Sequence, residues 1–406
     1  MTKTKPYSHL VSAVLGGLVA VVLGAILIAT GAIDTGDSKT IIRENGSVTP
    51  AVATQDGPSG ATVHNIYTHV GPGVAFIEAK VSGSGTSLFG GSGSGTATGS
   101  GFALDRTGNI LTNAHVVEGA SSGDVTVRFG KQDPVDAKIV GRDPSTDLAV
   151  LKIDPSKTKI TPLPLGDSNK VQVGDPAVAI GNPFGLENTV TTGIISAVQR
   201  SIDAPNGFSI DHVLQTDASI NPGNSGGPLL VNGRVIGVNA QIATGGSNGS
   251  VGIGFAIPIN TAKQIAPQLE KSGKVPHAYI GVTTAPVTPQ VARDLNLPAQ
   301  HGALVQDVTN GSPAEKAGLK AGKTDTSSGL VAGGDLIVGV DGKPIREPQD
   351  IATAIATKKP GERVEIRFYR GGKIETRTLT LAERPGKAPS TSQNQGGGGG
   401  GILPFP

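Results

Sequence analysis

Short runs rich in valine and isoleucine recur through the middle of the chain, and each is set off by turn residues. Representative runs lie at residues 125–129, 137–140, 177–180, 191–198 and 235–238. Runs of this length and spacing favour antiparallel barrels or a sandwich over βαβ units, in which strands alternate with longer helices. The 60 glycines, set against only four tyrosines and nine phenylalanines, also fit turn-rich β structure. The sequence therefore predicts a mainly β fold.

One serine stands in a glycine-rich stretch, Asn-Pro-Gly-Asn-Ser-Gly-Gly-Pro, that occupies residues 221–228. Gly223 can adopt backbone conformations closed to other residues, so the N–H groups of Gly223 and Ser225 can converge on one point, with Asn224 as a candidate third donor. Convergent N–H groups beside a serine hydroxyl form an oxyanion hole. The stretch therefore predicts a nucleophilic Ser225, although a plain turn between two strands is the simpler alternative.

A serine hydroxyl needs a neighbouring base, and the base needs a carboxylate to orient it. His115 follows a predicted strand, and Asp147 stands at the start of an apolar one. The chain order His115, Asp147, Ser225 is that of chymotrypsin, not of subtilisin or the α/β-hydrolases. Asp143 is a rival candidate for the orienting carboxylate. Asp217 is a weaker candidate, because it precedes Ser225 by only eight positions, too few for it to come from a separate part of a two-barrel fold.

The residues around these three positions resemble the HtrA family of serine proteases, the group that contains DegP and DegS. The matching segments are residues 99–102, 111–117, 146–152, 179–185, 215–228 and 254–258. The resemblance covers residues 62 to 383. It implies a chymotrypsin-like double β-barrel followed by one or two PDZ domains, and degradation of misfolded or specific exported proteins without ATP. It also implies a homotrimer assembled through the protease domains, with residues 63–67 as a candidate contact.

The position of the specificity pocket follows from the position of the serine. In the digestive enzymes of this fold, the residue six before the nucleophile lies at the base of the pocket, and here it is Ser219, beside Ile220. Ile253 and Phe255 are the apolar candidates for the pocket wall. Because none of these four residues is acidic, we expect cleavage after small or medium apolar residues such as Val, Ala or Leu, and not after Lys or Arg.

Length and composition narrow the function classes. A chain of 406 residues suits two or three domains, each able to bury a full core. Its 34 basic and 32 acidic residues nearly balance, so nothing points to a nucleic-acid partner. The absence of cysteine excludes disulfides and thiolate metal ligands. The predicted chemistry needs no cofactor and no metal, and none is predicted.

The N-terminal region carries a membrane signal. Two lysines precede an uncharged, apolar run at residues 10–33, which as a helix can span a bilayer core of about 30 Å. We predict a retained transmembrane signal-anchor helix in the cell membrane, with residues 1–9 in the cytoplasm because the lysines favour that side. Small residues at 30–32 make a cleaved signal peptide the alternative. Either way the rest of the chain faces the extracytoplasmic side, after a flexible polar linker at residues 34–61.

Two globular domains are expected after the linker. The protease domain is predicted at residues 62–273, and its closing helix at residues 261–272 has Asn260 as a candidate N-cap and Gly273 just past its end. A single PDZ domain is predicted at residues 276–383.

The predicted PDZ domain contains a segment that resembles the carboxylate-binding loop of HtrA-type PDZ domains, formed by Tyr279, Ile280, Gly281 and Val282. Successive backbone N–H groups there can hold the terminal carboxylate of a peptide that adds as a strand. A helix near residues 349–357 would form the other wall of the groove. The tail at residues 384–406, with six consecutive glycines, is predicted to be disordered.

These features together predict a membrane-anchored, extracytoplasmic serine endopeptidase. Its partners would be unfolded or exported protein substrates, and C-terminal peptides that regulate it through the PDZ domain. Two alternatives stay open at this point. One is a peptide-binding chaperone or adaptor with a mostly latent protease domain, and the other is an esterase that uses the same three residues.

Overall fold

The structure is a computed structural model, and it describes residues 62–81, 95–183, 185, 187–240, 252–324 and 331–388. Every described residue belongs to one compact unit of the chain, which lies within residues 61–406. The predicted transmembrane helix at 10–33, the predicted linker at 34–61 and most of the predicted tail at 384–406 lie outside the described residues. Within the described ranges, no helix is both long and apolar enough to cross a membrane.

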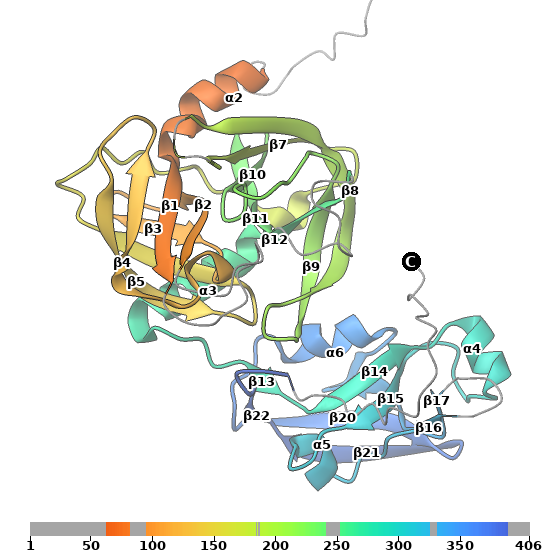
Figure 1. Cartoon of the computed structure of the whole chain (residues 1–406). Helices are drawn as coiled ribbons and strands as arrows, with labels where there is room; N and C mark the ends of the chain where they lie inside the picture. The colour runs from red at the N-terminus through yellow and green to blue at the C-terminus, as the bar shows by residue number, and fades with distance from the viewer. Residues whose placement is uncertain are drawn as a thin grey trace, which may run out of the picture. The chain divides into compact units, whose positions relative to one another are not determined.

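The first part of the described chain forms a closed antiparallel barrel with strand order β1-β2-β3-β6-β5-β4 (Figure 1). Its strands are β1 (Val74–Val81), β2 (Gly95–Ala103), β3 (Asn109–Thr112), β4 (Ala120–Phe129), β5 (Val135–Asp143) and β6 (Leu148–Ile153). Alternate residues of a strand point to opposite faces, and on β1 the inward residues Ala75, Ile77 and Ala79 are fully buried. Helix α2 (Val63–Val70) precedes this barrel.

A second closed barrel follows, with strand order β10-β11-β12-β9-β8-β7. Its strands are β7 (Pro176–Gly181), β8 (Thr189–Asp203), β9 (Ser209–Thr216), β10 (Pro228–Val231), β11 (Arg234–Ala240) and β12 (Gly254–Pro258). Strands β8 and β9 pair as far as Asp203 and Ser209, and we call residues 199–213 the β8–β9 hairpin. Two successive barrels confirm the predicted mainly β, chymotrypsin-like architecture.

Helix α3 (Ile259–Ser272) follows the second barrel and packs against strands β5 and β6 of the first. Its N-cap residue is Pro258, so the prediction that Asn260 caps the helix was wrong. The Asn260 N–H instead donates to the Ser168 hydroxyl at 3.2 Å, a partner 92 residues away that no local pattern indicates. At the other end Gly273 has φ +73° and donates its N–H to the Leu269 carbonyl at 2.8 Å, which ends the helix as glycine C-caps do.

The C-terminal part has the strand order β14-β15-β18-β20-β21, with β13 paired to β22. Its elements are β13 (Ala278–Tyr279), β14 (Val282–Pro286), α4 (Pro289–Asp294), β15 (Ala303–Val308), α5 (Pro313–Lys316), β16 (Lys323–Thr324), β17 (Val331–Ala332), β18 (Leu336–Val340), β19 (Lys343–Pro344), α6 (Pro348–Ile355), β20 (Arg363–Arg370), β21 (Lys373–Thr380) and β22 (Ala382–Glu383). Phe368 and Ile337 are fully buried at its centre. A small sheet with helix α6 along it is the arrangement expected of a PDZ domain.

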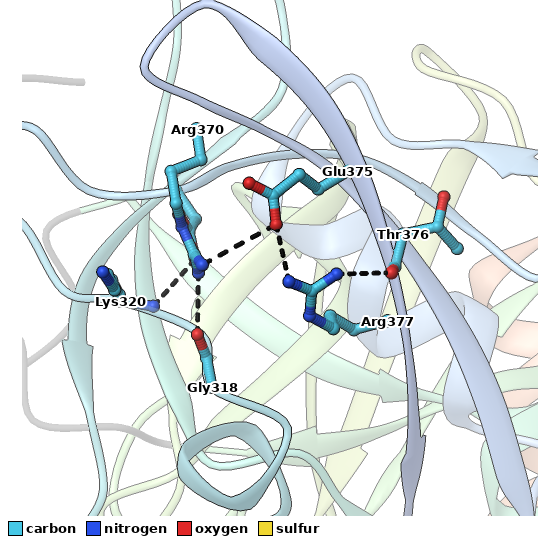
Figure 2. A network of polar contacts seen from close by, with 7 residues as sticks. Gly318, Lys320, Arg370, Glu375, Thr376 and Arg377 are labelled. Carbon is cyan, nitrogen blue, oxygen red and sulfur yellow. Dashed lines mark hydrogen bonds and ion pairs between the residues drawn. The ribbon is translucent and has the colours of Figure 1, made fainter.

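A buried ion pair holds the C-terminal sheet together. Asp335 is fully buried, and its carboxylate accepts hydrogen bonds from Arg370 at 2.6 and 2.8 Å and from the Lys320 N–H at 2.7 Å. Figure 2 shows the Arg370 guanidinium lying between the Gly318 carbonyl, 2.7 Å away, and Glu375. The hydrogen bond to Asp335 raises the pKa of Arg370, while partial burial opposes it.

Replacing Arg370 with alanine is expected to destabilise the C-terminal domain by about 3 kcal/mol, because the variant leaves the buried Asp335 carboxylate without its charged partner. The lower end of the usual range applies because the Arg370 side chain is 23% exposed. Calorimetry of the full chain measures the shift of the domain's unfolding transition. The control is Arg377→Ala, which removes an ion pair with Glu375 in which Arg377 is 44% exposed, and its expected cost is under about 1 kcal/mol. Equal shifts for the two variants would contradict the prediction.

Candidate active site

His115 and Asp147 meet between strands β3 and β6. His115 opens a short 3-10 helix (His115–Val117) just after β3, and Asp147 stands one residue before β6. The His115 Nδ1 lies 2.8 Å from Asp147 Oδ2, and the His115 backbone N–H donates to Asp147 Oδ1 at 3.0 Å. A carboxylate can only accept, so Nδ1 carries the proton and Nε2 of the neutral ring is left as an acceptor.

The surroundings of His115 favour its protonated form. Its side chain is 13% exposed and that of Asp147 only 1%. Burial lowers the pKa of His115, but the charge of Asp147 and its hydrogen bond raise the pKa by more, and Glu118 adds to them. The net result is a pKa above the ordinary value of 6.5. A reaction that needs the neutral ring therefore begins to lose rate at a higher pH than it would with an isolated histidine.

The structure shows which of the three candidate aspartates contacts His115. Asp143 is buried, but its carboxylate faces His277, with the ring Nε2 at 2.8 and 2.9 Å from the two oxygens. Asp217 accepts a hydrogen bond from the Ile194 N–H at 2.7 Å on strand β8. Asp147 is the carboxylate that contacts His115. It holds an unusual backbone conformation to do so, with φ +54°, a left-handed region that few non-glycine residues adopt.

Ser225 lies on a turn that packs against the strand leading to His115. The Ser225 carbonyl accepts a hydrogen bond from the Ser100 N–H of β2 at 2.8 Å, and Ser225 itself is buried. Gly226 has φ +83°, and a Cβ there would lie 2.1 Å from the Ser100 carbonyl and 2.4 Å from the Thr112 hydroxyl. Only glycine permits this approach. This close approach places Gly226 against Thr112 at the junction of the two barrels. Thr112 lies three positions before His115.

The N–H groups around Ser225 have different partners. Gly223 has φ +96°, and its carbonyl accepts a hydrogen bond from the Ser100 hydroxyl at 2.5 Å. The Asn224 N–H donates to the Asn221 carbonyl at 2.9 Å. A third oxyanion donor from Asn224 is therefore not supported, because the local turn already uses that N–H. Gly223 and Ser225 are left as the predicted pair.

The four residues predicted for the specificity pocket have different surroundings. A Cβ at Gly254 would lie 2.4 Å from Ile220 Cγ1, so the buried Ile220 packs behind that glycine. Phe255 packs instead against the apolar cluster of the β8–β9 hairpin. Successive residues of a strand face opposite sides, so Phe255 points away from the side on which Gly254 contacts Ile220. The placement of Phe255 in the pocket wall stays a prediction.

The other two pocket candidates lie nearer the surface. The Ser219 side chain is partly buried, and its carbonyl accepts hydrogen bonds from the Thr191 hydroxyl at 2.9 Å and from the Asn224 side-chain amide at 3.3 Å. Ile253 is 44% exposed. Residues 241–251, which join β11 to Gly252, lie outside the described part of the chain.

The predicted carboxylate-binding loop joins β13 to β14. The Ile280 carbonyl accepts from the Ala314 N–H at 2.9 Å, and the Gly281 carbonyl accepts from the Thr309 N–H at 3.0 Å. A trans peptide unit points its N–H opposite to its C=O. Because both carbonyls are turned inward, the N–H groups of Gly281 and Val282 face the other way. That orientation suits an incoming carboxylate.

A cavity of ≈ 980 Å³ opens beside this loop. Its walls include Tyr279 and Val282, Gln349 and Ala352 of helix α6, and Phe208 of the β8–β9 hairpin. The observed helix, Pro348–Ile355, lies close to the predicted one at residues 349–357. The volume and the shape between a strand and a helix suit a bound peptide.

Comparisons with known proteins agree with both domains. A trypsin-like peptidase domain profile matches residues 99–238, and a PDZ domain profile matches residues 278–381. Over 301 residues the chain is 45% identical to a probable periplasmic serine endoprotease, DegP-like, of Brucella suis biovar 1 (strain 1330), an alignment covering 73% of this chain and 55% of that protein. It is 43% identical over 293 residues to Protease Do-like 1, chloroplastic, of Arabidopsis thaliana, covering 72% of this chain and 65% of that protein.

The solved structures extend the likeness over both domains. The HtrA-type protease AlgW with tripeptide superposes with a TM-score of 0.65 at 34% identity, over 80% of this chain and 98% of that chain. The chain belongs to the HtrA-type serine proteases. The serine endoprotease from Yersinia pestis superposes with a TM-score of 0.57 at 30% identity. This HtrA-type chain spans about half the length, 55%, of the Brucella relative.

Sequence reasoning assigned no role to two residues that support the serine turn of this HtrA-type chain. Ser100 donates its hydroxyl to the Gly223 carbonyl and accepts from the Asn182 N–H at 2.7 Å. The available signal was indirect, because both lie in segments that carry the family resemblance. Their role depends on a contact between the two barrels, with Ser100 in the first and Asn182 just after β7 in the second.

Proposed function

We propose that this chain is a serine endopeptidase in which Ser225 is the nucleophile, His115 the general base and Asp147 the residue that orients the base. The observation that carries the proposal is the pair of hydrogen bonds from His115 to Asp147, at 2.8 and 3.0 Å, beside the turn that presents Ser225. A base fixed in this tautomer, next to a serine on a glycine-rich turn, is the arrangement that acyl transfer needs.

The proposed reaction has two halves. Ser225 Oγ attacks the carbonyl carbon of the peptide bond while His115 Nε2 takes the hydroxyl proton. The C–N bond then breaks as the imidazolium gives that proton to the leaving amine, which leaves an ester on Ser225. A water molecule, deprotonated by His115, attacks the ester, and the proton returns to Ser225 as the acid departs.

The charge that develops on the carbonyl oxygen needs donors placed in advance. The N–H groups of Gly223 and Ser225 are proposed for this role, and removing one such donor costs about 3–4 kcal/mol in related chemistry. Gly223 is held for it by the Ser100 hydroxyl, which bonds its carbonyl at 2.5 Å. The mechanism uses no metal and no cofactor.

The substrates proposed are unfolded or exported proteins, cleaved without ATP after small or medium apolar residues. The neutral Ser219 and the buried, apolar Ile220 support this preference, since neither offers a charge to Lys or Arg. Apolar residues are buried in folded proteins, so a pocket of this kind favours unfolded chains.

The location proposed is the extracytoplasmic side of a membrane, with residues 10–33 as a retained single-pass anchor. The Brucella relative is named periplasmic, which supports the side but not the anchor. The mass of the chain recovered from membranes tests whether the anchor is retained.

The PDZ domain is proposed to bind peptide C-termini and to regulate the protease. Support comes from the inward-turned carbonyls of Ile280 and Gly281 and from the ≈ 980 Å³ cavity beside them. The HtrA-type protease AlgW has been solved with a decapeptide and with a tripeptide. A homotrimer, with residues 63–67 as a candidate contact, is part of the same proposal.

Incubation of the full-length chain with unfolded casein in the absence of ATP tests the function. We expect degradation, with most cuts mapped by mass spectrometry falling after Val, Ala or Leu. A serine-reactive phosphonate should label the chain only at Ser225. Labelling without degradation favours the adaptor alternative, and cuts mainly after Lys or Arg contradict the proposed pocket.

A further inference from the structure

The turn that carries Asp147 is closed by another carboxylate. Asp143 ends strand β5, and its buried side chain accepts from the Ser145 N–H at 3.2 Å and from the Thr146 hydroxyl at 2.6 Å. We call residues 144–147 the β5–β6 turn. Since Asp147 follows Asp143 by only four positions, whatever fixes the Asp143 carboxylate also fixes the start of the turn that presents Asp147 to His115.

From outside the turn, the Asp143 carboxylate is contacted by His277, which lies in the segment between helix α3 and strand β13. The His277 Nε2 lies 2.8 Å from one carboxylate oxygen and 2.9 Å from the other. A carboxylate only accepts, so the ring nitrogen is the donor. The side chains are 20% and 3% exposed, so water competes little for this bond.

His277 is itself fixed from the C-terminal domain. Its backbone carbonyl accepts from the Arg384 N–H at 2.8 Å, where the pairing of β13 with β22 ends. The Arg384 guanidinium stacks 4.9 Å from the Phe208 ring centroid. Burial lowers the pKa of Arg384, and attraction to Asp143 and Asp211 opposes that shift. One histidine therefore joins the C-terminal sheet to the β5–β6 turn.

A second contact holds the same turn from the β8–β9 hairpin. The Asn206 side-chain amide donates to the Ser145 hydroxyl at 3.0 Å, and both residues are buried. The turn needs such support because Asp147 is in a left-handed conformation, at φ +54°, which persists only where surrounding contacts hold it.

We propose that His277 is a positioning residue for catalysis: through its hydrogen bonds to Asp143, it holds the β5–β6 turn in the conformation that brings the Asp147 carboxylate to His115. The inference rests on the proposed role of Asp147. Loss of the His277 ring leaves the buried Asp143 carboxylate short of a donor and frees the turn. Because the turn acts through the Asp147 carboxylate that orients His115, the expected effect is on proton transfer and not on substrate binding.

The test compares His277→Ala and His277→Gln in the full chain, with unfolded casein as substrate. His277→Ala is expected to lower kcat roughly tenfold and to leave KM within about twofold, since one hydrogen bond to a buried charge is lost. His277→Gln, whose amide can reach Asp143 as the ring nitrogen does, should restore kcat to within about threefold of the wild type. Thermal unfolding verifies that each variant is folded.

The matched control is His212→Ala. His212 Nε2 forms a 2.7 Å hydrogen bond with the Thr353 hydroxyl of helix α6, so this variant also removes a histidine contact with the C-terminal domain, but one that leaves the β5–β6 turn untouched. We expect its kcat to stay within about twofold of the wild type. An equal loss in both alanine variants overturns the proposal, as does an unchanged kcat in His277→Ala.

Two further outcomes separate a failure of the proposed function from a failure of the positioning role. If the wild type degrades no casein, the proposed function fails, whereas an active wild type with an unaffected His277→Ala variant contradicts the positioning role alone.

If His277→Ala does not fold, Asp143→Asn replaces it, because this variant keeps the shape of the side chain and removes its charge. A roughly tenfold loss of kcat is expected there too, and an unchanged kcat overturns the proposal.

Discussion

Replacing Ser225 with alanine is expected to lower kcat for an unfolded protein by roughly 10⁴-fold or more, because the reaction then lacks its nucleophile. The backbone of the turn should stay in place. The Ser225 carbonyl bonds the Ser100 N–H at 2.8 Å, and alanine keeps that carbonyl. Degradation of labelled casein by the full chain measures the loss, and thermal unfolding verifies the fold.

The control for this variant is Ser156→Ala, which removes a serine hydroxyl far from the site. Ser156 is exposed, and its hydroxyl donates only to the neighbouring Asp154, at 2.7 Å. Activity within about twofold of the wild type is expected. Substantial turnover by the Ser225→Ala chain would exclude Ser225 as the nucleophile and with it the proposed mechanism.

The mainly β class and the serine turn were predictable because their signals are local, whereas the double barrel was expected only from the family resemblance. Each apolar run is long enough to be a strand, and glycines around Ser225 mark a tight turn wherever it lies in the fold. The choice between Asp143 and Asp147 was not local. It depended on which carboxylate faces His115 and which faces His277, 134 residues beyond Asp143.

Two side-chain environments could not be read from local sequence. The Asn260 N–H of helix α3 donates to the Ser168 hydroxyl, so Asn260 is not the N-cap, and Phe255 packs against the apolar cluster of the β8–β9 hairpin. In each case a tertiary contact decided between local options that the sequence left nearly equal. The Asn224 N–H is different, because a short-range bond to Asn221 withdraws it, and only the backbone conformation of the turn reveals that.

Replacing Asp147 with asparagine is expected to lower kcat by roughly 10⁴-fold while the fold is kept, because the ring tautomer is reversed. The His115 N–H donates to Oδ1 at 3.0 Å, so the side-chain oxygen of asparagine stays there and its NH₂ group faces Nδ1. Nδ1 must then accept, which puts the ring proton on Nε2. A protonated Nε2 cannot take the proton of Ser225.

We also expect the Asp147→Asn variant to change the pH dependence of the activity. In the wild type, burial lowers the pKa of His115, but the Asp147 charge and hydrogen bond outweigh it, so the pKa lies above 6.5. Activity needs the neutral ring, so it should be full above that raised pKa and fall as the pH drops through it. Asparagine removes the two contributions of Asp147 that raise the pKa and leaves the burial that lowers it, opposed only by Glu118.

The acid limb of the residual Asp147→Asn activity should therefore move to lower pH than in the wild type, and profiles of kcat/KM between pH 5 and 9 measure the shift. Asp217→Asn is the control. Its carboxylate bonds the Ile194 N–H on β8 and not His115, so the acid limb should stay where the wild type has it. A wild-type rate that does not change between pH 5 and 8 would contradict the role of His115, and an Asp147→Asn limb at the wild-type position would contradict the role of Asp147.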